Sequence, residues 1–336
     1  MLFLSNEGNH DPTINLALEE YALRKLPLTD GGLLLFYVNE PSIIIGRNQN
    51  TAEEINQDYV ESHGIRVVRR LSGGGAVYHD LGNLNFSFIT LDDGESFRNF
   101  AKFTQPVITA LRKLGVDAEL SGRNDIQVGD KKISGNAQFA AHGRMFSHGT
   151  LLFDSDIDQV VSALKVNAIK FASKSTKSVR ARVGNIRDYL MNDMTIEQFR
   201  QALLREIFAT APKEIPMYQM SSEDWEAVHQ LANERYRSWE WNYGRSPKFN
   251  VEHSHKFASG IVHVRLFVEK GSIQACKIYG DFFGIGEIAD VENVLIGVKH
   301  EPAALRDVLA NLDVERYLGG VTKEDLVSLL MLKDVN

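Results

Sequence analysis

The alternation of apolar and polar residues divides the chain into a strand-rich first half and a later part with more helices. Apolar runs predict strands at four places, residues 33–38, 42–45, 65–69 and 84–90, with further short strands up to residue 153. Apolar residues at helical spacing predict helices after Pro12 and near residues 96–113, 157–165, 195–210 and 222–236. Because strands and helices do not alternate regularly, the pattern favours an α+β fold with mixed sheets over a doubly wound parallel sheet.

Polar residues mark the expected starts of several helices. Asp11 is expected to cap the first helix, with Pro12 at the first helical position. Thr51 followed by Glu54 has the pattern of a capping box and predicts the start of a second helix. Thr322 is the expected cap of the last helix, near residues 322–333.

The end of the chain has the pattern of a separate small domain. Residues 244–247, Gly-Arg-Ser-Pro, are typical of a linker. The segments expected beyond it are two strands joined by a hairpin turn and two helices, at residues 261–269, 273–281, 302–312 and 322–333. We therefore predict a large domain with mixed β-sheets flanked by helices, residues 1–244, and a small C-terminal α+β accessory domain, residues 248–336.

The composition is ordinary for a protein with a full hydrophobic core. Of the 336 residues, 43% are apolar and 24% are charged, and the net charge is −7. Nucleic-acid binders are usually basic, so this charge argues against that class. No stretch approaches the roughly 20 apolar residues of a membrane helix, and the N-terminus lacks a basic signal-peptide region. The single cysteine, Cys276, excludes an intramolecular disulfide, and we expect a cytoplasmic protein.

A glycine-rich segment at residues 69–80 is the first candidate for chemistry. It reads Arg-Arg-Leu-Ser-Gly-Gly-Gly-Ala-Val-Tyr-His-Asp and follows an expected strand. Consecutive glycines let the backbone approach a ligand closely and direct N–H groups at an anion. Arg69 and Arg70 would add positive charge and bidentate geometry. A flexible turn is the commoner role of an isolated glycine triplet, and the segment matches neither a Walker A loop nor a dinucleotide-binding fingerprint.

Two further segments place polar residues beside expected strands. Lys131 and Lys132 follow an expected hairpin turn at residues 129–130, and at most one of them can point into a site, because neighbouring strand residues face opposite ways. A solvated lysine pair is the alternative. His148 precedes another apolar run, where a lone histidine more often has a structural role.

Metal ligands at suitable spacing are lacking in the sequence. The histidine pair at residues 253 and 255 has no set of cysteines or carboxylates at metal-ligand spacing. We therefore expect no metal that is held by protein side chains alone.

A basic stretch covers residues 165–187. It holds seven lysines and arginines and no acidic residue, in a chain whose net charge is −7. It is either a solvated basic stretch or a loop that closes over a polyphosphate or docks an acidic partner.

In these segments the sequence resembles the lipoate–protein ligase A family, which belongs to a superfamily with biotin–protein ligases and octanoyltransferases. The matching sequence motifs run from Arg69 to Gly244 in family order: RRLSGGGAVYHDLGN, SGRND, KKISGNAQ, HGTLLF, SVRARV and SWEWNYG. Several motifs in register are far more specific than one glycine loop. The family fold, a large domain with mixed sheets and a small C-terminal domain, agrees with the pattern described above.

The resemblance implies a two-step reaction. The carboxylate of lipoate attacks the α-phosphate of ATP, with Mg²⁺, and gives lipoyl-AMP and pyrophosphate. A lysine ε-amine of the acceptor protein then attacks the adenylate. The implied acceptors are the apo lipoyl domains of 2-oxoacid dehydrogenase E2 subunits and the glycine-cleavage H protein, with no nucleic acid and no membrane. Because the lipoyl tail is uncharged, an apolar slot is expected to bind it.

The resemblance also assigns roles to residues. Lys132, which precedes Ile-Ser-Gly, matches the family's essential lysine. The residues that match the ATP- and lipoyl-AMP-binding positions are Arg70, Ser72, Gly73, Gly74, Gly75, Ala76, Val77, Tyr78, Asn83, Asp125 and Lys132. Lipoate is expected to contact Arg70, Ser72, Lys132 and His148. The loop that would close over the adenylate includes Lys177, Ser178, Val179, Arg180 and Arg182.

Two other functions remain open at this point. An octanoyl- or lipoyl-transferase of the same fold needs a nucleophilic cysteine in its pocket, whereas Cys276 falls in an expected strand of the accessory domain. A nucleic-acid-binding module could use the basic stretch, although the acidic net charge and the lack of a known binding signature argue against it.

Overall fold

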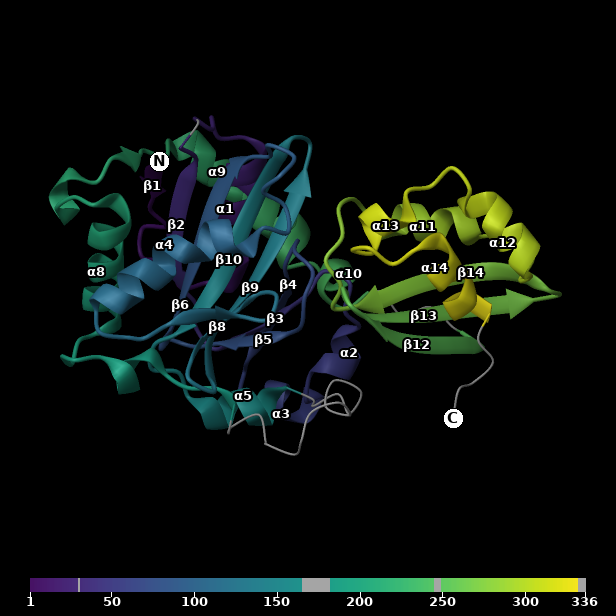
Figure 1. The fold of residues 1–336 in the computed structure, drawn as a ribbon, viewed down its shortest axis with the longest axis horizontal. Coiled ribbons are helices and arrows are strands. Elements are labelled where there is room, and N and C mark those ends of the chain that lie inside the picture. The colour runs from purple at the N-terminus through teal and green to yellow at the C-terminus, as the bar shows by residue number, and fades with distance from the viewer. Residues whose placement is uncertain (30, 165–181, 245–248, 332–336) are drawn as a thin grey trace.

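The computed structural model describes residues 1–29, 31–164, 182–244 and 249–331. Figure 1 shows two lobes, a larger one built around a wide sheet and a smaller one at the C-terminal end. We use "C-terminal lobe" for residues 251–331, which contain a sheet and helices of their own, and "N-terminal lobe" for the described residues before them.

A mixed eight-stranded sheet organises the N-terminal lobe. In spatial order its strands are β11 (Met217–Tyr218), β1 (Leu2–Leu4), β2 (Leu33–Val38), β6 (Asn83–Leu91), β10 (Arg144–Leu152), β9 (Lys131–Ala141), β8 (Asp125–Val128) and β7 (Glu119–Ser121). Strand β1 is parallel to both of its neighbours, and every neighbouring pair from β2 to β7 is antiparallel. The predicted α+β fold with mixed sheets is confirmed.

Helices pack on both faces of this sheet (Figure 1). One face carries α4 (Phe100–Lys113) and α8 (Ile196–Phe208), and the opposite face carries α1 (Pro12–Arg24) and α9 (Ser222–Leu231). Phe86 belongs to the first core and Phe146 to the second. The connections contain short helices: α2 (Thr51–Glu54), α3 (Gln57–Ser62), α5 (Ile157–Ala163), η1 (Ile186–Tyr189), η2 (Pro212–Glu214), η3 (Ala232–Tyr236) and α10 (Trp239–Asn242).

Strand β6 is buried on both faces but polar on one of them. Side chains alternate between the two faces of a strand. Leu84, Phe86 and Phe88 pack into the core under α4. The intervening side chains, which face the side of α1, are Asn83, Asn85 and Ser87, and all three are buried. A buried polar surface therefore lies in the middle of the sheet.

A second sheet has the order β4 (Arg66–Arg69), β3 (Ser42–Ile45) and β5 (Val77–His79). Strand β3 is parallel to β4 and antiparallel to β5. Because β4 and β5 flank β3, the glycine-rich segment between them, residues 70–76, crosses the end of β3. The topology thus places this segment at the end of the second sheet.

The C-terminal lobe has its own core, drawn from residues 251–331. An antiparallel sheet of β12 (Val251–Phe257), β13 (Gly260–Glu269) and β14 (Ser272–Gly280) packs with α11 (Ile288–Leu295), α12 (Pro302–Leu309), α13 (Val314–Tyr317) and α14 (Lys323–Met331). The predicted hairpin is confirmed, and Lys270 and Gly271 have φ values of 51° and 77°, as a tight hairpin turn requires. Strand β12 and helices α11 and α13 were not predicted from the sequence.

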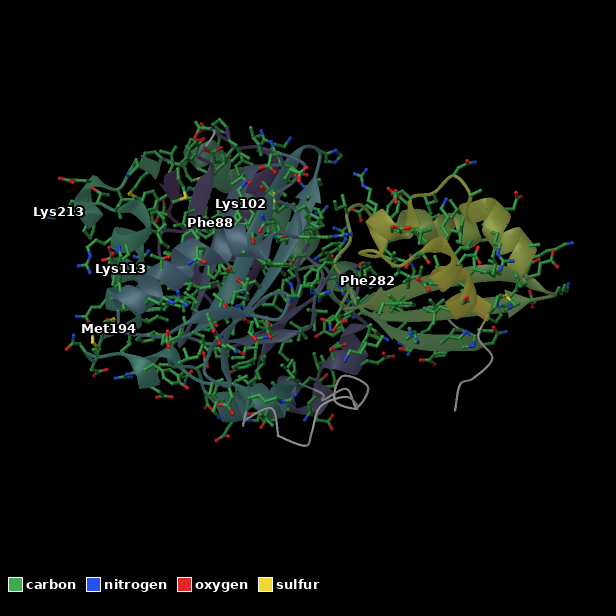
Figure 2. All side chains as sticks on the ribbon, viewed as in Figure 1. Phe88, Lys102, Lys113, Met194, Lys213 and Phe282 are labelled. Carbon is green, nitrogen blue, oxygen red and sulfur yellow. The ribbon has the colours of Figure 1, made fainter. Side chains whose placement is uncertain are left out.

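The two lobes are in direct contact. The Gly280 N–H donates to the carbonyl oxygen of Asn48 at 2.7 Å, and Arg47 forms an ion pair with Glu287. Phe282, which Figure 2 labels where the lobes meet, is fully buried. No helix of the described ranges is both long enough and apolar enough to cross a membrane.

Two predicted helix caps are confirmed. An Asp11 carboxylate oxygen accepts the Thr13 N–H at 2.8 Å and caps α1. At the start of α14, the Thr322 hydroxyl accepts the Asp325 N–H at 3.1 Å, and the Asp325 carboxylate accepts the Thr322 N–H at 3.2 Å. This reciprocal pair is a capping box.

One predicted helix cap and one predicted helix start are wrong, although both helices are present. The N-cap residue of α2 is Asn50, and the Thr51 hydroxyl donates to the carbonyl oxygen of Asn242 at 2.5 Å instead of capping the helix. Helix α4 begins at Phe100 rather than at residue 96. The Ser96 hydroxyl bonds to the Asp93 carboxylate at 2.7 Å in the preceding loop. In both cases the hydroxyl that was expected at the start of a helix forms a hydrogen bond elsewhere, Thr51 with a residue distant in sequence and Ser96 within the loop before the helix.

Candidate functional site

The Arg70 side chain holds the glycine-rich segment in place. Arg70 is 5% exposed, and its guanidinium donates to Ser72 Oγ and to the carbonyl oxygens of Ile44, Gly73 and Gly75 at 3.0, 3.0, 2.7 and 2.8 Å. Burial lowers the pKa of Arg70 to about 10, so the side chain remains charged at neutral pH. Arg70 therefore shapes the segment and also places a fixed positive charge there.

Arg69, the other arginine of the motif, is directed elsewhere. It is buried, and its guanidinium donates to the carbonyl oxygens of Gly46, Arg47 and Gln49 at 2.8, 3.1 and 2.6 Å. Its side chain stabilises the turn after β3. The expectation that both arginines would bind an anion is therefore wrong for Arg69.

The glycine triplet provides space for the C-terminal lobe. Gly74 has a φ of +90°, which favours glycine. A Cβ at Gly73 would overlap the carbonyl oxygen of Phe282, and a Cβ at Gly74 would lie 3.1 Å from the Phe283 ring. The triplet thus serves lobe packing as well as any ligand approach.

Below the segment, a buried hydrogen-bonded chain fixes His148. Ser72 Oγ lies 2.7 Å from His148 Nε2, and His148 Nδ1 lies 2.9 Å from the Glu19 carboxylate. An ionised Glu19 can only accept, so a neutral imidazole would carry its proton on Nδ1 and accept the Ser72 hydroxyl proton at Nε2. Because Ser72 also accepts from Arg70, the chain locks the imidazole orientation. It has a positioning role, since Ser72 and Glu19 are both buried.

Lys132 lies at the start of β9, where it pairs in register with Gln127 of β8, and its side chain reaches Asp125 at the other end of β8. The predicted hairpin at residues 129–130 is present, with a bulge between Ile126 and Gln127. Lys132 Nζ is 2.8 Å from an Asp125 carboxylate oxygen, and the two side chains are 41% and 38% exposed. The ammonium is therefore fixed in direction but still accessible to a ligand.

One cavity, the inner cavity, has a volume of about 140 Å³. Its apolar lining comes from Leu16, Tyr37, Ile44, Val77, Ala137 and Phe283. Its polar lining comes from Arg70, His79, Asn85, Asn124, Lys132, Asn136, His148 and Thr150. The lining therefore mixes apolar and polar side chains, because the inner cavity lies on the polar face of β6.

A row of paired residues forms one wall of the inner cavity. Asn85 on β6 pairs with Thr150 on β10 and with Tyr37 on β2. On the other side of β10, Gly135 of β9 donates its N–H to the Thr150 hydroxyl at 3.2 Å. The row crosses four strands, a span of roughly 14 Å at about 4.8 Å per strand spacing. The cavity can therefore hold an elongated ligand that lies across the strands.

A larger cavity, the outer cavity, has a volume of about 640 Å³ and lies next to the inner cavity. The two share Ala76, Val77, Lys132, Gly135 and Thr150. The charged groups on the outer cavity are Arg123, Asp125, Asp130, Lys132 and Arg182. Lys132 thus lies at the junction of the two cavities, both of which it lines.

Most of the predicted site residues converge on these two cavities. Those that line at least one of them are Arg70, Gly74, Gly75, Ala76, Val77, Tyr78, Asp125, Lys132, His148 and Arg182. Lys132 lines both cavities and Lys131 lines neither. This agrees with the prediction that at most one of the two lysines points into a site, because neighbouring strand residues face opposite ways. Of the predicted closing loop, Lys177, Ser178, Val179 and Arg180 lie outside the described residues.

Three predicted site residues line neither cavity. Ser72 is buried against His148, and Gly73 is covered by the backbone of Phe282. The Asn83 side chain is buried and donates to Asn85 Oδ1 at 3.0 Å, while Asn85 is the asparagine that lines the inner cavity. The alternation of Asn83, Asn85 and Ser87 along one strand could have indicated this face. Phe283 carried no local signal, because it reaches the cavity only through the packing of the lobes.

The competing transferase function would need a nucleophilic cysteine at the site. Cys276 on β14 is buried in the core of the C-terminal lobe, lines neither cavity, and has a pKa raised by burial. It is therefore not an acyl-accepting nucleophile in its described position.

Among the described residues, no group of three or more histidines, cysteines or carboxylates could hold a metal ion.

Comparison with known protein families agrees with this geometry. Residues 11–208 match the family described as Lipoyl protein ligase A/B catalytic domain, and residues 246–330 match Bacterial lipoate protein ligase C-terminus. The chain is 59% identical to lipoate–protein ligase LplJ of Bacillus subtilis, over 98% of this chain and 100% of the relative. It is 52% identical to lipoate–protein ligase 1 of Staphylococcus aureus, over 98% and 100%.

Solved structures show the same fold. Plasmodium falciparum LipL1 in complex with lipoate superposes with a TM-score of 0.79 at 24% identity, over 98% of this chain and 99% of the other. A bipartite lipoate–protein ligase of Thermoplasma acidophilum, described with its E2 lipoyl domain, gives 0.63 at 34%, over 74% and 98%. A lipoate–protein ligase A bound with ATP gives 0.58 at 32%, over 73% and 97%. The chain belongs to the lipoate–protein ligase family.

Proposed function

We propose that this protein activates lipoate with ATP, forms lipoyl-AMP, and transfers the lipoyl group to a lysine of an acceptor protein. The position of Lys132 at the junction of the two cavities is the observation that carries this proposal. The inner cavity would hold the acyl chain, and the outer cavity would hold the nucleotide. The carboxylate and the α-phosphate then meet beside the Lys132 ammonium.

The residues at this junction suit charge that develops during adenylation. As the carboxylate attacks, negative charge grows on the α-phosphoryl oxygens. The Lys132 ammonium and the backbone N–H groups of residues 74–77 would stabilise that charge. In the structure Asp125 neutralises Lys132, and an incoming nucleotide would replace Asp125 as its partner.

The outer cavity also suits a magnesium ion that arrives with ATP. Mg²⁺ is usually held by one or two carboxylates together with substrate phosphates. Asp125 and Asp130 line the outer cavity and would be the protein ligands. When bound, the ion would neutralise charge on the phosphates.

The second step needs an acceptor lysine to reach the adenylate. Candidate acceptors are the lipoyl domains of 2-oxoacid dehydrogenase E2 subunits and the glycine-cleavage H protein, in the cytoplasm. We also propose that residues 177–182 close over the adenylate and protect the mixed anhydride from water. Residues 1–244 would form the catalytic domain and residues 248–336 the accessory domain.

The test is ATP–pyrophosphate exchange measured with and without lipoate. Wild-type protein should exchange only when lipoate is present, and it should then modify a purified apo lipoyl domain. Lys132→Met should lower exchange by roughly 10²–10³-fold, because a charge-stabilising group is lost. Lys131→Met is the matched control and should retain exchange, since Lys131 lines neither cavity. Exchange that does not depend on lipoate, or near-normal exchange by Lys132→Met, would contradict the proposal.

A further inference from the structure

A buried histidine of the inner cavity has an unused hydrogen-bonding atom. His79 is 3% exposed and lines the inner cavity. No described residue forms a hydrogen bond with its Nε2 atom. Buried polar atoms are nearly always paired, so an exception at a cavity wall points to a ligand.

Neighbouring amides fix which nitrogen of His79 carries the proton. Asn15 Nδ2 donates to the carbonyl oxygen of Asn9 at 2.9 Å and to Asn39 Oδ1 at 2.8 Å. The carbonyl oxygen can only accept, so this contact sets the orientation of Asn15, and the orientation of Asn39 follows. Asn39 Nδ2 must then donate to His79 Nδ1, at 2.9 Å. The proton of the neutral ring is therefore on Nε2.

The ring is also kept neutral. Burial, together with the nearby charge of Arg70 and with His148, lowers the pKa of His79 to about 3. At neutral pH, His79 therefore offers the inner cavity one N–H donor and no charge. A ligand that satisfies it must bring a hydrogen-bond acceptor.

The strand order places this donor far from the reacting end of the slot. His79 pairs with Ser42 on β3 and bonds to Asn39, the residue after β2. Lys132 is on β9, and β10 and β6 lie between β9 and β2. A ligand whose carboxylate lies at Lys132 would therefore present its tail, not its carboxylate, to His79.

We propose that His79 determines acid specificity by donating its Nε2–H to a sulfur of the dithiolane ring of lipoate. This inference rests on the proposed function. A sulfur of this cyclic disulfide is a weak acceptor, but a buried donor without any acceptor costs more in free energy. The methyl end of octanoate offers no acceptor, so His79 disfavours octanoate relative to lipoate.

The kinetic test compares kcat/KM for adenylation of lipoate and octanoate. His79→Phe keeps an aromatic ring and removes the donor, and the lipoate preference should fall by roughly tenfold. His79→Gln, which retains an N–H donor, should recover part of the preference. His229→Phe on the exposed side of α9 is the matched control and should leave the ratio unchanged. An unchanged ratio in folded His79→Phe would overturn the proposal.

A second measurement does not depend on a variant that folds. Nitrogen NMR of the ¹⁵N-histidine-labelled wild-type protein should show the Nε2–H tautomer of His79. The Nε2–H signal should shift with lipoate more than with octanoate. A proton on Nδ1, or equal shifts with both acids because a water molecule pairs with Nε2, would refute the role of His79. Lack of lipoate-dependent exchange in the wild type would instead refute the proposed function, so the two failures can be distinguished.

Discussion

The inner and outer cavities meet at Lys132 but are built in opposite ways. Around the inner cavity, Arg70 and His148 are buried and held by hydrogen bonds within the protein. At the outer cavity, Lys132 and Asp125 are 41% and 38% exposed. The comparison indicates that the inner cavity, the proposed acyl site, is preformed, while the outer cavity, the proposed nucleotide site, has charged groups that remain partly in water. Side chains of the inner cavity should therefore contribute much more to stability than those of the outer cavity.

The strongest test of this contrast is Arg70→Met. The change leaves one hydroxyl and three carbonyl oxygens without the buried donor that now satisfies them. Lost partners of buried polar groups cost about 1–3 kcal/mol each, and local rearrangement recovers part of this. We expect the free energy of unfolding to fall by about 3–5 kcal/mol, measured by urea denaturation.

Arg306→Met is the matched control for that experiment. Arg306 pairs with Glu324 on the surface of the C-terminal lobe, and the two side chains are 54% and 64% exposed. Such a pair contributes about 0–1 kcal/mol. If Arg70→Met proved no more destabilising than Arg306→Met, the inner cavity would not be the rigid part of the molecule.

A smaller effect is expected in the pH dependence of stability, through His79. Folding lowers the pKa of His79 from 6.5 to about 3. Between these values the unfolded chain binds a proton that the folded protein does not bind, so stability falls as the pH decreases. One such proton contributes roughly 1.4 kcal/mol per pH unit. Urea denaturation between pH 6 and pH 5 should show a slope that is steeper by about this amount in wild type than in His79→Phe. Equal slopes would mean that His79 is not held neutral.

The sequence was most informative where function requires a local motif. The glycine-rich segment, the lysine pair and His148 are each recognisable from a few neighbouring residues, and the family resemblance of these segments predicted site residues, most of which line the cavities. The Asp11 cap and the hairpin at Lys270 were predictable for the same reason, because their contacts are local.

The missed features depend on contacts between distant parts of the chain. Phe283 reaches the inner cavity because the C-terminal lobe packs on Gly73 and Gly74, about two hundred residues earlier. Thr51 has a capping pattern, but its hydroxyl bonds to the backbone of Asn242 instead. Strand β12 is largely polar and exposed, so its pairing with β13 had no apolar pattern to indicate it. Motifs identify chemistry, whereas tertiary packing decides which of their residues face the ligand.

The smallest expected change in stability belongs to Lys132→Met, although its effect on adenylation should be large. The ion pair with Asp125 is partly exposed at both side chains, so solvent screens it, and such pairs contribute about 0–1 kcal/mol. The backbone carbonyl of Lys132 accepts the Gly184 N–H at 3.0 Å, a bond that the substitution retains. We therefore expect the free energy of unfolding to change by less than about 1 kcal/mol. Urea denaturation of wild type and Lys132→Met in the same buffer measures this difference. A loss as large as that expected for Arg70→Met would show that the outer cavity is also held together by its charges. The reduced exchange of Lys132→Met could then reflect a damaged fold rather than a missing ammonium.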